Sequence, residues 1–314
     1  AHATRLMQEG TIIFPRYLIR GGVAMWREIS DLFTIGPFPT RNLADNLADL
    51  HAQLAANLLG RDRMKTLAQS EPNALQQAIT GILRQSANAM SISISKLHSC
   101  RAEERLDDGS LICVDVRVVA LPQSKLILDF TGTSPTHPGN LNATRAIVQS
   151  AVLYVLRLLL QEDLPLNEGL LGPVEIICPP CLLNPTFGED SHTHPAVVGG
   201  NVEVSQRLVD TLIRAFGLQA CSQGTMNNFL FGNDRFGYYE TIAGGAGAGK
   251  GYPGASAIHT HMTNTAITDP EVIESRYPVR LHQFAIRPHS GGRGLWPGGD
   301  GVVRELVASN CSPR

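Results

Sequence analysis

The segment from Ala220 to Thr265, called the polar segment below, constrains the fold more than any other part of the sequence, because it is rich in groups that an ordinary core excludes. It combines runs of glycine with amide and hydroxyl side chains and carries few charges. Buried amides and hydroxyls cost free energy unless each one finds a hydrogen-bond partner. The polar segment is therefore predicted to be either a solvated loop or the wall of a polar pocket, and its amide side chains are candidates for substrate binding: Gln223, Asn227, Asn228 and Asn264.

Glycine makes up 30 of the 314 residues, which favours many tight turns over a regular helical bundle. With 43% hydrophobic residues, 17% charged residues and a net charge of −2, the composition is that of a globular protein. No cluster of Lys and Arg indicates a nucleic-acid site. The longest apolar run, Ala151–Leu160, is well short of the ~20 residues that a membrane span needs. Six irregularly spaced cysteines do not suggest a disulfide framework, so we expect a cytoplasmic protein.

In the first hundred residues, apolar side chains recur every three or four positions, which is the pattern of amphipathic helices. Helices are predicted at 25–33, at 40–60 with Thr40 as the N-cap, and from Pro72 onward. We expect residues 1 to about 100 to be mainly helical. Residues from about 110 to 314 are expected to form a mixed α/β part that carries the site.

In the second part, alternating apolar and polar residues predict strands at 112–118 and 126–130, joined as a hairpin. The almost wholly apolar stretch 146–160 predicts a buried helix. Further predicted elements are strands at 174–178 and 302–307, and a helix at 201–216 with a left-handed cap at Gly217. The predicted fold class is therefore mixed α+β, with a hairpin-rich sheet, packed helices and glycine-rich loops that line a polar pocket.

Gly200 and Asn201 stand at the start of the predicted helix 201–216. Free backbone N–H groups and the helix dipole can hold an anion at such a position, for example a substrate carboxylate. The simpler interpretation is a glycine turn followed by an Asn cap, and both interpretations stay open.

The stretch from Ile258 to Met262 has a strand-like pattern, which would place His259 and His261 on one side. Two imidazoles on one face can be metal ligands, or a general base and its neighbour. They can equally be hydrogen-bonded walls of a pocket.

The glycine run Gly244–Gly249 resembles a nucleotide-binding loop only superficially, since Lys250-Gly251 continues the loop where a phosphate-binding motif requires Ser or Thr. A close-approach turn that lines the pocket is the favoured interpretation.

Cys178 and Cys181 are followed by His192 and His194 at intervals that zinc sites tolerate. Two prolines between the cysteines and a His-x-His pair in a loop are unusual for such a site. A strand end followed by a surface turn is favoured.

Several motifs occur in a consistent order along nearly the whole chain: Arg41–Asn57, Asp129–Ser134, Pro165–Gly169, Val197–Arg207, Thr268–Glu271 and Gly298–Gly301. In this order they resemble the hydantoinase B/oxoprolinase family. The segments Tyr238–Thr241 and His259–Thr265 are most similar to its 5-oxoprolinase branch.

The resemblance implies ATP-dependent opening of a cyclic amide, either 5-oxoproline to glutamate or a hydantoin to an N-carbamoyl amino acid. It implies an A-type domain or subunit that binds ATP and Mg, and an oligomeric assembly. It also implies that this chain is a central fragment without the family's N- and C-terminal parts, inactive alone, and that a divalent metal is held by ligands upstream.

Within this resemblance, catalytic roles are expected for His259, His261 and Glu240. Substrate binding is expected at Gly200 and Asn201 and at the amides of the polar segment. Two alternatives stay open: the ketone carboxylase branch of the family, and a scaffold that binds the A-type partner through the helix from Leu43 to Leu58.

Overall fold

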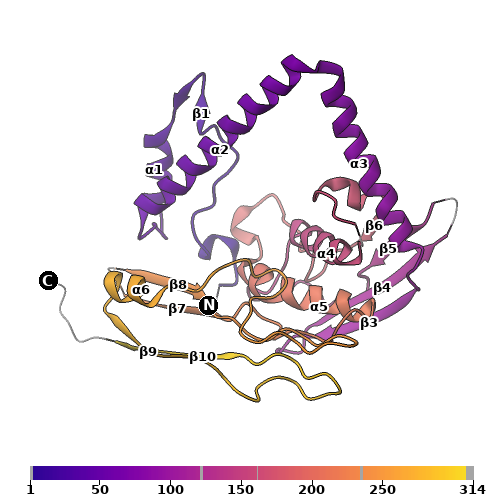
Figure 1. The fold of residues 1–314 in the computed structure, drawn as a ribbon. Helices are drawn as coiled ribbons and strands as arrows, with labels where there is room; N and C mark the ends of the chain where they lie inside the picture. The colour runs from indigo at the N-terminus through magenta and orange to yellow at the C-terminus, as the bar shows by residue number, and fades with distance from the viewer. Residues whose placement is uncertain (1–2, 121–122, 161, 234–235, 309–314) are drawn as a thin grey trace.

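The computed structural model describes residues 3–120, 123–160, 162–233 and 236–308. Helices and small sheets are mixed, which confirms the predicted α+β class. Figure 1 shows three parts: an N-terminal helical hairpin, a central sheet with two helices on it, and a C-terminal group of hairpins and glycine-rich loops. None of the described helices combines the length and apolar character that a bilayer crossing needs.

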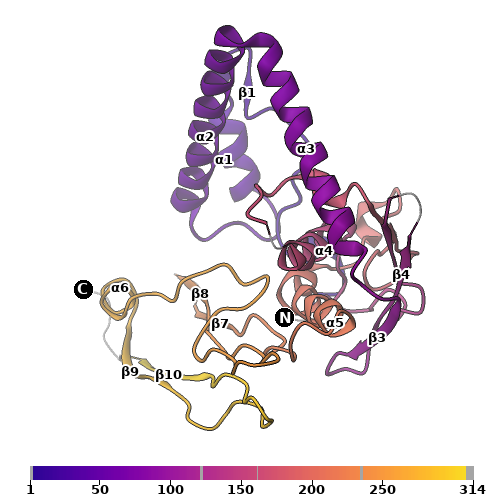
Figure 2. The same ribbon diagram turned by 45° about the vertical axis from the view of Figure 1, so that its right-hand side comes forward.

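The N-terminal part consists of a short hairpin and three helices. Strands β1 (Ile19–Arg20) and β2 (Val23–Ala24) precede α1 (Trp26–Thr34), α2 (Leu43–Ser70) and α3 (Pro72–Ile94), after a 3₁₀ turn η1 (Leu6–Gln8). Figure 2 shows α2 and α3 as two arms that rise from the body of the molecule.

The limits predicted for α2 are wrong at both ends. The side chain of Asn42, and not Thr40, caps the helix by accepting a hydrogen bond from the Asp45 N–H, whereas the Thr40 hydroxyl bonds the Asn46 side chain. The helix also continues ten residues beyond Gly60. A single helical glycine costs only about 1 kcal/mol relative to Ala, which good helix formers on both sides offset.

The central sheet has the order β3 (Cys100–Arg105), β4 (Leu111–Val119), β5 (Lys125–Asp129) and β6 (Val174–Ile177). The first two pairings are antiparallel, and β5 and β6 are parallel. The connection between β5 and β6 contains α4 (Arg145–Leu159), which is the predicted buried helix, and a 3₁₀ turn η2 (Glu168–Leu171). The inward-facing residues of the sheet and of α4 form the main core.

Helix α5 (Ser205–Ala215) packs between the sheet and the C-terminal part, against α4, β3 and β4. A π-helical turn, η4 (Gly200–Val204), precedes it, and a 3₁₀ turn η3 (Ser191–Thr193) lies upstream. Gly217 has a φ of +64° and Leu218 donates its N–H to the Ile213 carbonyl, so the predicted left-handed cap is confirmed.

The C-terminal part contains two separate hairpins, β7 (Asn228–Gly232) with β8 (Gly237–Thr241), and β9 (Val279–Ile286) with β10 (Val302–Ala308). Helix α6 (Pro270–Arg276) precedes β9. Long glycine-rich loops follow β8 and connect β9 to β10, and Figure 1 shows the loop after β8 next to α5.

Candidate functional site

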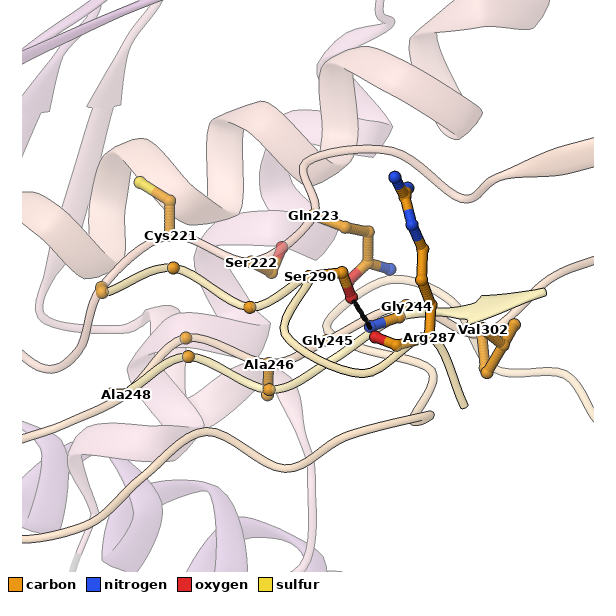
Figure 3. A pocket seen from close by; sticks show the side chains of 18 of the residues that line it. Cys221, Ser222, Gln223, Gly244, Gly245, Ala246, Ala248, Arg287, Ser290 and Val302 are labelled. Atoms are coloured by element: carbon orange, nitrogen blue, oxygen red, sulfur yellow. Dashed lines mark hydrogen bonds between the residues drawn. The ribbon is translucent and has the colours of Figure 1, made fainter. Parts of the chain in front are cut away.

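A pocket with a volume of about 650 Å³ lies where three segments of the C-terminal part meet. Its walls are the chain after α5 (220–227), the glycine run after β8 (242–248) and the loop between β9 and β10 (287–302). Figure 3 shows side chains from all three segments around it. The first two walls belong to the polar segment.

The glycines of the pocket walls let backbone lie directly on backbone. A Cβ atom at Gly245 would overlap the carbonyl oxygen of Gly299, and one at Gly299 would overlap that of Ala255. The Ala246 N–H donates to the Ala255 carbonyl, and the Gly299 N–H donates to the Ala246 carbonyl. These two donors are therefore used within the loops and are not open to a nucleotide.

Two of the predicted substrate-binding amides line the pocket. The side-chain Oε1 of Gln223 accepts a hydrogen bond from the Thr260 hydroxyl at 3.2 Å, and its Nε2 donates to the backbone carbonyl of Thr225 at 3.2 Å. Asn227 has a φ of +51° and donates from Nδ2 to the Ile242 carbonyl at 3.0 Å. Within the described residues the Oδ1 of Asn227 accepts no hydrogen bond, so it remains available to a ligand.

The charged side chains of the pocket are Arg287 and Arg293, and no Asp or Glu among the described residues lines it. No sequence pattern pointed to these arginines beforehand. The glycine-rich stretch around Arg293 is a local signal of a loop. Arg287 has no such signal, because it directly follows an ordinary strand.

A buried polar network lies behind the pocket wall. Asp210 of α5 accepts hydrogen bonds from the N–H and hydroxyl of Ser222, at 3.0 and 3.1 Å. Its Oδ1 lies 3.1 Å from Nε2 of His261, and Nδ1 of that imidazole lies 3.3 Å from the Tyr154 hydroxyl. The His261 and Asp210 side chains are 4% and 0% exposed. Burial, followed by the charge of Asp210, raises the pKa of Tyr154.

The prediction that His259 and His261 project from one strand is wrong. Ile258 makes only an isolated bridge with Gly244, and His261 lies in a turn with a φ of +53°. Gln206 of α5 holds this turn by accepting from the Met262 N–H and donating to the Thr260 carbonyl. Gln206 and this turn are more than 50 residues apart in the sequence, so no local sequence pattern predicts their contact.

His259 is a partly buried imidazole that lies outside the pocket lining. Its Nδ1 is buried and has no hydrogen-bond partner among the described residues. Desolvation lowers its pKa, which favours the neutral form.

Glu240 is fully engaged in structural contacts away from the pocket. Its Oε1 accepts from Nε of Arg304 at 2.7 Å, and its Oε2 accepts from the Tyr238 hydroxyl at 2.7 Å. The Arg304 and Glu240 side chains are 0% and 2% exposed. A carboxylate held in this way is poorly placed to contact a substrate, in contrast to the expected catalytic role.

The two remaining amides of the polar segment also lie outside the pocket lining. The Asn228 side chain accepts a hydrogen bond from the Tyr239 hydroxyl at 2.8 Å, and Asn264 is exposed. The structure thus brings together Gln223 and Asn227 but none of the other expected site residues.

The N-terminus of the α5 region has no free donors for an anion at its described glycines. The Gly199 N–H donates to the Asn140 carbonyl and the Gly200 N–H to the Val197 carbonyl. A Cβ at Gly200 would overlap the Asn142 carbonyl oxygen, so close packing explains this glycine, and Asn201 is exposed. The expected glycine turn with an Asn cap is also wrong, because Gly200 and Asn201 lie inside the π-helical turn and no side chain caps its N-terminus.

Nowhere in the described ranges do three His, Cys, Asp or Glu side chains come together as a metal site. The sulfurs of Cys178 and Cys181 are 4.0 Å apart, but His194 bonds the Gly188 carbonyl instead. The Cys178 thiol and nearby backbone N–H groups lower the pKa of Cys181 to about 7. The described residues therefore do not fit a divalent metal.

Comparisons with known proteins cover almost the whole chain. The sequence profile of the family described as Hydantoinase B/oxoprolinase matches residues 1–312. The chain is 45% identical over 286 residues to 5-oxoprolinase 1 of Arabidopsis thaliana, a match that covers 85% of this chain and 22% of the plant protein. It is 40% identical over 337 residues to 5-oxoprolinase of Saccharomyces cerevisiae, covering 97% and 26%. The chain spans about a quarter of the length of these relatives.

Two solved structures share the fold. The ATP-dependent caprolactamase from Pseudomonas jessenii matches 98% of this chain and 55% of its own, with a TM-score of 0.79 and 22% identity. Nucleotide-free acetone carboxylase matches 99% and 45%, with a TM-score of 0.78 and 15% identity. The profile match and the sequence identities together show that this chain belongs to the hydantoinase B/oxoprolinase family.

Proposed function

We propose that this chain forms part of an ATP-dependent enzyme that opens a cyclic amide by hydrolysis, with 5-oxoproline as the substrate and glutamate as the product. The observation that carries the proposal is its identity of 40% and more, along most of the chain, to proteins named 5-oxoprolinase. A hydantoin that opens to an N-carbamoyl amino acid is the closest variant of the same reaction.

The chemistry explains why two components are needed. The amide of a five-membered lactam is stabilised by resonance and is a poor electrophile, so phosphorylation of its oxygen supplies the missing leaving group. We assign ATP and Mg to an A-type partner, as the family resemblance implies, and the glycine run of this chain continues through Lys250 and Gly251 without the Ser or Thr of a phosphate-binding motif. A divalent metal, if the whole protein holds one, takes its ligands from outside the described residues.

For this chain we propose a role in binding and orienting the ring. The free Oδ1 of Asn227 can accept the ring N–H, and Gln223 forms the adjacent wall. His259 lies outside the pocket lining and its Nδ1 is buried, so it receives no role as a base on the ring, although its lowered pKa keeps the imidazole neutral. His261 and Asp210 are positioning residues behind the wall, and Glu240 receives no catalytic role.

The test measures glutamate release from 5-oxoproline together with ADP formation, using the full-length protein with its A-type partner. A hydantoin and a ketone with bicarbonate are assayed in parallel. Glutamate formed in step with ADP supports the proposal. ADP formed only with the ketone would instead indicate the carboxylase branch, which the fold shared with acetone carboxylase also allows.

Adjacent asparagines provide a matched pair of variants for the site. Asn227→Gly removes a pocket amide while tolerating the positive φ, and it should lower kcat/KM by about 10- to 100-fold if that amide binds the ring. Asn228→Ala removes an amide that points to Tyr239 and should leave kcat/KM within about twofold of the unaltered protein, because a surface contact of this kind is worth little. Equal effects of the two variants would refute this site.

A further inference from the structure

Arg287 and Arg293 are two cations on a pocket whose described lining holds no anionic side chain. Neither guanidinium forms a hydrogen bond or an ion pair with any described residue, in contrast to Arg304, which is closed into a contact with Glu240. The chain as a whole carries a net charge of −2, so this local excess of positive charge is not a general property of the surface. A pocket of this charge favours an anionic ligand.

The nearest carboxylate in the same loop is committed elsewhere. Asp300 accepts hydrogen bonds from the N–H groups of Gly291 and His289, at 2.8 and 3.2 Å. These N–H groups lower its pKa, and it forms no ion pair with Arg293 in the described structure, although both line a smaller neighbouring pocket. Asp300 thus shapes the loop that carries Arg293 and leaves the guanidinium unpaired.

The other donors around the pocket distinguish between classes of anion. The N–H groups of Ala246, Gly298 and Gly299 donate to backbone carbonyls, so these three amides are not open to a phosphate group. Guanidinium groups remain, and these bind a carboxylate through two parallel hydrogen bonds. Trp296, which is 37% exposed, adds an apolar wall beside them.

We infer that Arg287 and Arg293 bind the carboxylate of the substrate and make the enzyme selective for a lactam that carries one. The inference rests on the proposed function, because it places the lactam in the same pocket as Asn227 and Gln223. It moves the carboxylate away from Gly200, whose N–H is occupied. A neutral lactam of the same ring size would lose this contact.

The experiment compares 5-oxoproline with 2-pyrrolidinone, which has the same ring without the carboxylate. Binding of each is measured by calorimetry on the full-length protein with its A-type partner, without ATP. The variants are Arg287→Gln, Arg293→Gln and the double variant. Arg280→Gln is the matched control, since Arg280 is an exposed arginine on β9 outside the pocket.

We expect the double variant to bind 5-oxoproline about 10- to 100-fold more weakly, the range for hydrogen bonds to charged groups, with little change for 2-pyrrolidinone. Arg280→Gln should change neither. An equal loss for both ligands, or no loss, would overturn the inference. Lys at both positions should restore part of the affinity, which separates lost charge from a damaged fold.

Three further outcomes separate failure of the site from failure of the proposed function. If inorganic phosphate binds strongly through both arginines while 5-oxoproline competes with it only weakly in the unaltered protein, the arginines serve a phosphoryl group and the carboxylate inference fails. If 5-oxoproline binds through the arginines but is never consumed with ATP, the proposed function fails while the carboxylate site stands. Glutamate release with an unchanged substrate preference in the double variant would support the proposed function and refute the carboxylate site.

Discussion

Among single residues, Glu240 and Arg304 form an ion pair that is closed off from water. The guanidinium also donates to the Thr268 carbonyl at 2.9 Å and lies 5.1 Å from the centre of the Phe284 ring, while its Nη1 has no described partner. The pair joins β8 to β10. A buried charged side chain is stabilised by its counter-ion, so removing one partner of the pair leaves a buried charge that nothing compensates.

Glu240→Gln should therefore lower the free energy of unfolding by about 3 to 5 kcal/mol, because Arg304 would stay buried without its counter-ion. Urea unfolding measures the change. The double variant Glu240→Gln/Arg304→Met should recover much of the loss, since it removes both charges. A normal stability of Glu240→Gln combined with a loss of turnover would show a catalytic carboxylate instead.

His259 gives a prediction for pH. Its pKa is lowered by desolvation in the folded state, so the unfolded chain takes up the proton first, near its ordinary pKa of about 6.5. Stability should consequently be retained above that pH and fall as the pH drops through this range. His259→Gln should flatten this slope in urea unfolding at pH 5 to 8, and an unchanged slope would contradict the buried, neutral state.

Among the elements, α5 and the glycine loops together build the pocket. The apolar residues of α5 pack into the core, whereas its buried polar side chains hold Ser222 and the turn at His261. The loops after β8 and β9 can lie against each other only because glycine lacks a Cβ atom.

Substitution of two glycines tests this packing. Gly245→Ala should destabilise the protein by about 1 to 3 kcal/mol, the range for overpacking, and should weaken ligand binding, because the new methyl would overlap the Gly299 carbonyl. Gly60→Ala is the control, since open space surrounds Gly60 in α2, and it should stabilise by about 0.5 to 1 kcal/mol. Thermal unfolding compares both, and tolerance of Gly245→Ala would refute the packing.

In the whole molecule, the α2–α3 hairpin extends away from the body, as Figures 1 and 2 show. Its apolar side chains include Leu59 and Leu67, which are 59% and 52% exposed. The body of this chain leaves these side chains uncovered. The relatives are about four times longer than this chain, and under the proposed function the uncovered face is where the A-type partner would dock.

Placing charge on the hairpin should therefore weaken assembly without unfolding this chain. Leu59→Glu/Leu67→Glu should reduce recovery of the complete assembly in size-exclusion chromatography. Gln69→Glu, at an exposed polar position of the same helix, is the control and should assemble normally. Normal assembly and turnover of the Leu variant would show that the exposed end of α2 beyond Leu58 does not hold the assembly together.

The elements with local signals could be predicted from the amino-acid sequence alone. The period of apolar residues located α1, an almost wholly apolar stretch located α4, alternation located β4 and β5, and Gly217 ended α5. The ordered motifs identified the family, and the profile match confirms that identification. These signals depend on neighbouring residues, so they are readable before any long-range contact is known.

Which side chains share a site depends instead on the packing of distant segments. Packing put the arginines on the pocket, turned His261 toward Asp210 and closed Glu240 into an ion pair. His261 and Asp210 are 51 positions apart and Glu240 and Arg304 are 64 apart, so these contacts depend on how distant segments pack. Residue type reports the chemistry that a side chain can perform, but burial and long-range partners decide whether it faces a ligand or holds the fold.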